Sequence, residues 1–170
     1  MKLSIQIGDV LDQPADVLIS TANPQLNMSG GVNGAILLRG GQAVQEELHE
    51  HLKRRGLDSA APGSVVRTDP GPLAVKHVPV AVAVDAFYDS SVDLLRATIE
   101  AALCEAQRLH AATVVMPSLA TGYGPLTMDQ FAEGLRLALQ RPWPPIQELK
   151  VVLRREDDAA VVRAALDLVT

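Results

Sequence analysis

Two glycine-containing loops are the segments of this chain best suited to binding chemistry. The first loop, Thr21–Val32, carries Gly30-Gly31 directly before a predicted helix, and the second, Ser118–Thr127, carries Gly122 and Gly124 before another. Glycine lets the backbone approach a phosphate closely and aim N–H groups at it. Helix N-termini add partial positive charge. Two such loops facing each other would hold a diphosphate between them.

Each loop taken alone is more often a structural glycine turn than a phosphate site. The sequence has no G-x-x-x-x-G-K-[ST] motif, and Gly122-Tyr123-Gly124 lacks the third glycine of a dinucleotide fingerprint. The case for a ligand therefore depends on how the rest of the chain positions both loops.

Strands and helices alternate along the chain. Apolar runs predict strands at Leu3–Ile7, Val17–Ser20, Ser64–Thr68, Val75–Val84, Ala112–Met116 and Leu149–Leu153. Helical spacing predicts helices at Val32–Arg39, Gln42–Arg55, Ser91–His110, Thr127–Leu139 and Asp157–Leu168. This order predicts an α/β fold, a three-layer αβα sandwich with a mixed, mostly parallel central sheet of about six strands. Pro79 lies inside one predicted strand, where we expect a break, a bulge or an edge.

Composition narrows the function. The 170 residues, 48% of them hydrophobic, suit one domain over residues 1–170. The net charge of -5 argues against a nucleic-acid partner, which needs many contacts from Lys and Arg to phosphates. No apolar run reaches about 18 residues and no signal-peptide core is visible, so we expect no membrane span and a cytoplasmic location.

Neither metal nor cofactor is predicted. The single cysteine, Cys104, lies in an amphipathic stretch and is interpreted as a small buried hydrophobe. His49 and His51 stand two residues apart on a predicted helix, where their side chains diverge.

The motifs around both loops resemble those of macro domains. Gly8-Asp9-Val10, the run Ala15–Asn23 (ADVLISTAN) and Gly30–Ile36 (GGVNGAI) are similar to that family's opening strand, buried strand and glycine loop. Pro117–Pro125 (PSLATGYGP) is similar to its second phosphate loop, although one or two residues shorter. The resemblance covers nearly the whole chain in the right order. It implies binding of ADP-ribose, free or on a mono-ADP-ribosylated protein.

The resemblance also implies roles for single residues. Asp9 would accept a hydrogen bond from the adenine amino group, beside the backbone of Val10, and Asn23 would bind the distal ribose. Taken alone, Asp9 is more typical of a turn or cap residue, but its place after the first predicted strand favours the ligand role. The alternative for Asn23 is a turn residue before Pro24, a common pairing.

Both loops would contact the diphosphate through backbone, with Tyr123 packing on the distal ribose. The implied residues are Gly30, Gly31 and Val32 in the first loop, and Thr121, Gly122, Tyr123 and Gly124 in the second. The other implied ligand contacts are Ala22, Asn33, Ser118 and Ala120.

The adenine side is less typical of the family. Members often stack an aromatic residue on adenine after the last strand, whereas this chain has Leu153-Arg154-Arg155 there. One hypothesis is that the Arg154 guanidinium stacks on the purine. The alternative, a solvated surface arginine, is equally consistent with the sequence.

Catalysis is the alternative to binding alone. In one hydrolytic branch of the family, an Asp in the glycine loop and a His one helical turn later assist a water, but this chain has Asn33 and Leu37 there. Asn is no carboxylate base. A hydrolase acting on protein adducts or O-acetyl-ADP-ribose would instead orient water with Asn23 and Asn33. Glu46-Glu47 are interpreted as a solvated helix face, and a degenerate pocket with a structural role is a third hypothesis.

Overall fold

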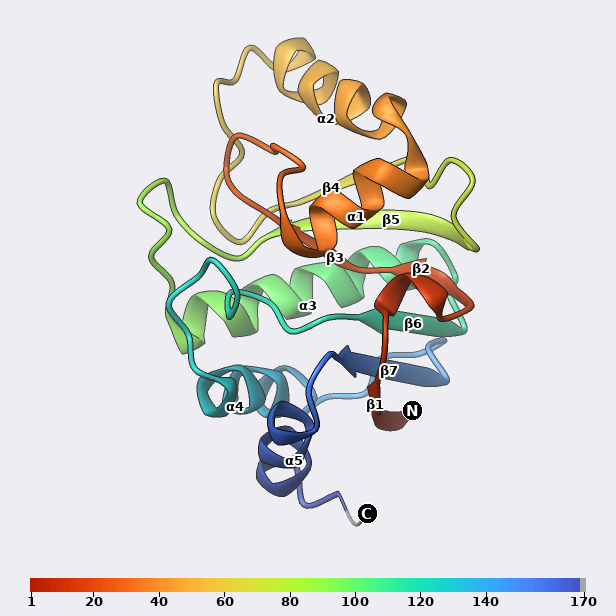
Figure 1. Cartoon of the computed structure of the whole chain (residues 1–170), viewed down its shortest axis with the longest axis vertical. Helices are drawn as coiled ribbons and strands as arrows, with labels where there is room; N and C mark the ends of the chain where they lie inside the picture. The colour runs from red at the N-terminus through yellow and green to blue at the C-terminus, as the bar shows by residue number, and fades with distance from the viewer. Residues whose placement is uncertain (169–170) are drawn as a thin grey trace.

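A largely parallel sheet runs through the molecule (Figure 1). The computed structural model describes residues 1–168. The strands are β1 (Lys2–Ile7), β2 (Ala15–Leu18), β3 (Ser20–Ala22), β4 (Val65–Thr68), β5 (Val75–Val82), β6 (Thr113–Met116) and β7 (Glu148–Leu153). Their order is β1-β7-β6-β2-β5-β3, and β4 also pairs with β5. All described pairings are parallel except that between β4 and β5.

β2 and β3 are two parts of one extended segment. Val17 pairs with His77 of β5 and Ser20 pairs with Val80, so both strands keep the same register against β5. The segment is interrupted at Ile19, which continues the hydrogen bonding to β6 by donating to Val115 O at 2.9 Å. Counted this way, the sheet has about the six strands predicted from the alternation of elements.

Pro79 does not break its own strand, contrary to expectation. β5 runs from Val75 to Val82, and Pro79 is buried inside it, paired with Arg67 of β4. In the shared register Pro79 stands opposite Ile19, where β2 ends before β3 begins. Because proline has no N–H to donate to a ladder, the interruption falls in the neighbouring strand instead.

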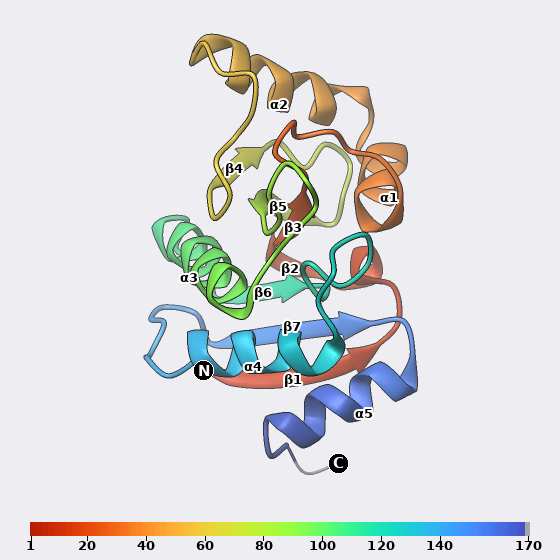
Figure 2. The same ribbon diagram turned by 90° about the vertical axis from the view of Figure 1, so that its left-hand side faces the viewer.

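Helices cover both faces of the sheet (Figures 1 and 2). They are η1 (Val10–Asp12), α1 (Gly31–Gly40), α2 (Gln42–Arg54), α3 (Val92–Arg108), α4 (Met128–Ala138) and α5 (Glu156–Ala165). α3, α4 and α5 share one apolar cluster with the sheet, and η1, α1 and α2 share another. The predicted three-layer αβα sandwich is therefore confirmed. Most predicted elements differ from the observed ones only near their ends, but the predicted strand Val17–Ser20 is divided into β2 and β3, and η1 was not predicted.

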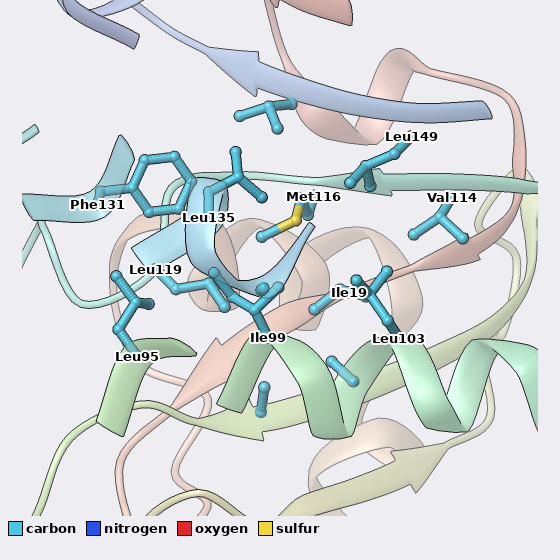
Figure 3. Close-up of a cluster of buried hydrophobic side chains, with 14 of the residues drawn as sticks. Ile19, Leu95, Ile99, Leu103, Val114, Met116, Leu119, Phe131, Leu135 and Leu149 are labelled. Atoms are coloured by element: carbon cyan, nitrogen blue, oxygen red, sulfur yellow. The ribbon is translucent and has the colours of Figure 1, made fainter. Parts of the chain in front are cut away.

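The larger cluster lies between the sheet and the pair α3 and α4 (Figure 3). Leu95, Ile99 and Leu103 recur every four residues on α3, so they share one face, and each is fully buried. Phe131 and Leu135 of α4 meet them from the side. Ser91 begins α3 by accepting a hydrogen bond from Leu94 N at 3.1 Å. This packing holds the sheet rigid below the loops that follow its strands.

Asp16, near the start of β2, connects this strand to its neighbours β5 and β6. Its Oδ2 accepts hydrogen bonds from the backbone N–H groups of Ala112 and Thr113, at 2.8 and 3.0 Å, and its Oδ1 lies 2.7 Å from Lys76 Nζ. The bond from Lys76, and then those from Thr113 and Ala112, lower the pKa of Asp16 to about 2, against desolvation, which raises it. The carboxylate thereby fixes the neighbouring strands whose far ends carry the glycine loops.

Two further expectations concern single features. Within residues 1–168 no helix combines the length and apolar character that crossing a bilayer requires. Cys104, expected to be buried, is only half-buried on α3, and its Sγ accepts a hydrogen bond from Arg141 Nη2 at 3.4 Å.

Candidate ligand-binding site

The carboxyl ends of four parallel strands meet at one edge of the sheet. β6 lies between β2 and β7, and β1 pairs with β7, so the segments after β1, β3, β6 and β7 come together there. Gly8 N donates to Leu153 O at 2.9 Å, which keeps the ends of β1 and β7 side by side. This is the edge at which open α/β sheets bind ligands.

A cavity of about 860 Å³ lies at this edge. Nearly all of the residues that were predicted to contact the ligand line this cavity, and they come from four separate segments of the chain. Those that line it are Val10, Ala22, Asn23, Gly30, Gly31, Val32, Asn33, Ser118, Ala120, Thr121, Gly122, Tyr123, Gly124 and Arg154. The volume lies within the range typical of small-molecule sites.

The first glycine loop delivers the N-terminus of α1 to the cavity. Gly30 is the N-cap, with φ of 67°, and Gly31 has φ of 54°, a left-handed conformation that costs other residues energy. Among the described residues no side chain caps this helix. The N–H groups of Gly31, Val32 and Asn33 are thus the first-turn donors that a helix leaves without an internal partner, and an anion at this end would accept from them.

Gln45 of α2 holds the segment that leads into this loop. Its Oε1 accepts from Met28 N at 2.7 Å, and its Nε2 donates to Leu26 O at 2.8 Å. The two backbone partners fix the orientation of the amide, and Leu26 itself has φ of 57°. Gln45 therefore sets the path of the chain just before Gly30.

The second loop is closed by its own backbone. Leu126 N donates to Ala120 O at 3.0 Å, Ala120 has φ of 58°, and a Cβ on Gly124 would collide with the Ala120 backbone. α4 begins just after, but Thr127 and Gln130 cap it with a reciprocal pair of hydrogen bonds. The second loop therefore offers loop amides to a ligand, whereas the first offers the open end of a helix.

The two loops meet across the cavity mouth. A Cβ on Gly30 would lie 2.6 Å from the Tyr123 hydroxyl oxygen, although Tyr123 is 75% exposed. A residue with a side chain at position 30 would displace the tyrosine. The absence of a side chain at Gly30 is thus what permits the close approach.

Asn23 is held in a defined orientation at the end of β3. Its Oδ1 accepts from Asn27 N at 3.0 Å, and its Nδ2 donates to the Tyr88 hydroxyl oxygen at 3.0 Å. Asn27 and Tyr88 both line the cavity. The turn role and the ligand role of Asn23 are therefore compatible, because its Oδ1 stabilises the turn and its Nδ2 lies at the cavity.

The positions tied to catalysis have structural partners. Asn33 is buried, and its Oδ1 accepts a hydrogen bond from Ser20 Oγ at 2.6 Å. Leu37 is half-buried and packs on the apolar cluster of α1 and α2. Glu47 was predicted to be a solvated residue of a helix face, but although it is exposed, its Oε2 accepts hydrogen bonds from Thr68 Oγ1 at 2.8 Å and Asp69 N at 2.6 Å.

Asp9 differs from the other residues that were predicted to contact the ligand. It is not among the described residues that line the cavity. Its Oδ1 caps η1 by accepting from Leu11 N at 3.0 Å, and its Oδ2 lies 3.1 Å from Arg39 Nη2 and 3.8 Å from Arg154 Nη2. The cap interpretation that the sequence left open is thus the one seen here, and the adenine contact stays a prediction.

Several lining residues were not predicted as ligand contacts. They include Thr21, Asn27, Ser29, Val84, Tyr88, Val152 and Asp158. Tyr88 is the most informative of them, because it reaches Asn23 from a loop 65 positions later in the chain. The sequence signal that could have found it is the aromatic pair Phe87-Tyr88 shortly after the predicted strand Val75–Val84.

The charges around the cavity are few. Arg154 and Asp158 are the only Asp, Glu, Lys or Arg residues among the described lining residues. Arg39, outside the lining, has its pKa raised, first by its hydrogen bond to Asp12 and then by the nearby charges of Asp9 and Asp12. Within residues 1–168 no three His, Cys, Asp or Glu side chains are grouped as a metal site. An anion here would be held mainly by backbone N–H groups.

Comparison with solved structures identifies the same fold elsewhere. A macrodomain mutant of Oceanobacillus iheyensis with ADPR has a TM-score of 0.87 at 22% identity, over 97% of this chain and 91% of that one. A Trypanosoma brucei macrodomain in complex with ADP-ribose has a TM-score of 0.77 at 21% identity, over 96% and 68%.

Sequence relatives agree with this fold. A macro domain-containing protein of Streptomyces griseus is 31% identical over 149 residues, which are 86% of this chain and 84% of the relative. An uncharacterised protein of Pyrobaculum aerophilum is 30% identical over 146 residues, 86% of this chain and 79% of that protein. The family model for the macro domain matches residues 19–134, more than half of the chain. The chain therefore belongs to the macro domain family.

Proposed function

We propose that this protein binds ADP-ribose, free or attached to a protein, with the diphosphate between its two glycine loops. The observation that carries the proposal is the convergence of Gly30 and Tyr123 at one cavity, across more than half of the chain. The first loop contributes the unpaired amides of a helix N-terminus, and the second contributes loop amides. Such donors suit a diphosphate in a protein of net negative charge.

The family supports the choice of ligand. The Oceanobacillus iheyensis macrodomain is described with ADPR and also with ADP, at a TM-score of 0.87 in both cases. The cavity of about 860 Å³ has room for a ligand of that size, and Asn23 and Tyr88 supply polar groups beyond the two loops.

Hydrolysis of ADP-ribosyl adducts is the second candidate. It draws on Asn23, whose amide is oriented at the cavity, and on Asn33, which lines it. However, the Asn33 Oδ1 already accepts a bond from Ser20, and an amide does not take up a proton near neutral pH. We therefore favour binding without an efficient general base.

Calorimetric titration with ADP-ribose, compared with AMP, tests the proposal. We expect saturable binding of ADP-ribose at one site per chain and binding of AMP at least tenfold weaker, because AMP lacks the second phosphate and the distal ribose. No heat with ADP-ribose, or equal affinity for both ligands, would overturn it. Release of label from ADP-ribosylated protein, compared with an Asn23→Ala variant, tests the hydrolase candidate.

A further inference from the structure

The loop between β5 and α3 holds Tyr88 in an unusual backbone conformation. Tyr88 has φ of 62°, which is rare for a residue with a bulky side chain. Asp85 closes the turn around it, since its Oδ1 accepts from Phe87 N at 2.8 Å and Asp89 N at 2.9 Å. Tyr88 N donates to Asp85 O at 3.1 Å. The turn therefore fixes the position from which the tyrosine ring enters the cavity lining.

The hydroxyl oxygen of Tyr88 is the partner of the Asn23 amide at the cavity. Because Asn27 N donates to the Asn23 Oδ1, the Nδ2 end must face Tyr88, whose oxygen accepts one of its protons. The second Nδ2 proton then remains for an acceptor on the ligand. Oxygen atoms of a sugar are acceptors of this kind.

We infer that Tyr88 is a positioning residue for Asn23, and that Asn23 held in this way selects ligands that carry a ribose beyond the diphosphate. This inference rests on the proposed function and names the specificity of the same site. Without the tyrosine oxygen, the Asn23 Nδ2 loses its partner in the protein. Its direction toward the sugar is then set by one bond, that from Asn27 to Oδ1.

The test compares ADP-ribose with ADP, which has the adenine, the first ribose and the diphosphate but no distal ribose. In calorimetry, Tyr88→Phe keeps the ring and removes the hydroxyl. We expect its affinity for ADP-ribose to fall about tenfold, the range of one lost hydrogen bond, while its affinity for ADP stays within twofold. Phe87→Ala is the matched control, because Phe87 shares the turn but is 89% exposed and does not line the cavity.

A double-mutant cycle separates positioning from loop stability. If Tyr88 acts through Asn23, adding Tyr88→Phe to Asn23→Ala lowers the affinity for ADP-ribose by less than twofold further. An equal loss for ADP and ADP-ribose, or additive losses in the cycle, would overturn the inference while leaving the proposed function intact. Failure of the unmodified protein to bind ADP-ribose overturns both.

Discussion

The hydroxyl oxygen of Tyr123 lies 2.6 Å from the point that a Cβ on Gly30 would occupy. This contact joins the loop after β3 to the loop after β6 across the cavity. Because β2, which continues into β3, and β6 are paired neighbours in the sheet, the core below fixes the separation of these loops. The geometry of the site therefore depends on the pairing of β2 with β6 as well as on the glycines of the two loops.

Substitution of Gly30 should impair binding more than folding. Gly30→Ala places a methyl group against the Tyr123 hydroxyl and strains a backbone with φ of 67° and ψ of 167°, a conformation essentially restricted to glycine, so we expect the affinity for ADP-ribose to fall at least tenfold. Calorimetry gives the affinity, and urea unfolding should show a loss of only about 1 kcal/mol.

Gly56→Ala is the control for backbone strain. Gly56 has φ of 63° and open space around its Cβ position, outside the cavity lining. We expect a similar loss of stability with unchanged affinity. If both variants bind ADP-ribose like the unmodified protein, the close approach of the two loops is irrelevant to the ligand.

Gln45 should matter for binding although it does not line the cavity. Gln45→Ala removes both bonds that hold the chain at Leu26 and Met28. We expect a loss of affinity for ADP-ribose of about threefold to tenfold and faster amide hydrogen exchange at residues 26–29. Gln42→Ala, exposed on the same helix, should change neither quantity. Unchanged exchange in Gln45→Ala would show that the loop holds its path without this amide.

Arg154 is the residue proposed to hold adenine. Arg154 lines the cavity with a side chain that is 66% exposed, so its guanidinium is available to stack on a purine. We expect Arg154→Ala to lower the affinities for ADP-ribose and for AMP alike, by about threefold to tenfold. The neighbouring Arg155→Ala, whose arginine pairs with Asp157, should bind both normally. Normal affinities in Arg154→Ala would end the stacking hypothesis.

Asp16 should make the fold sensitive to acid. Its folded-state pKa of about 2 lies below the ordinary value of 3.8, so its stabilising contribution is complete above pH 4. That contribution is lost as the pH falls from about 4 toward 2. We expect Asp16→Ala to lower the free energy of unfolding at neutral pH by on the order of 1–2 kcal/mol, after allowance for solvent screening.

The measurement is urea unfolding at several pH values between 7 and 2.5. The difference between the unmodified protein and Asp16→Ala should shrink over the acid part of this range. Asp58→Ala, an exposed aspartate on a surface loop, serves as control and should follow the unmodified protein. A difference that does not depend on pH would show that the ion pair with Lys76 adds nothing.

Much of the fold was predictable because its signals are local. The four-residue spacing of Leu95, Ile99 and Leu103 predicts α3, and Thr127 followed by Gln130 predicts the start of α4. Pro79 shows the limit of such signals. A proline in a strand predicts an interruption of the hydrogen bonding between two strands, but the register of their pairing determines which of the two is interrupted.

The candidate site was predictable wherever a backbone conformation requires glycine or a motif marks a loop. Gly30 and Gly124 are examples of this kind. Tyr88 and Gln45 were not predicted, because their importance lies in single hydrogen bonds to residues distant in sequence. Asp9 shows another limit, since its motif position did not reveal that Arg39 and Arg154 lie beside its carboxylate.

A crystal structure of the protein with ADP-ribose tests the central claim most directly. Our account predicts that the diphosphate lies between the two loops. Its oxygens should accept hydrogen bonds from the N–H groups of Gly31 and Val32 on one side and of Gly122 to Gly124 on the other. A diphosphate bound at any other place, or held by side chains alone, would contradict it.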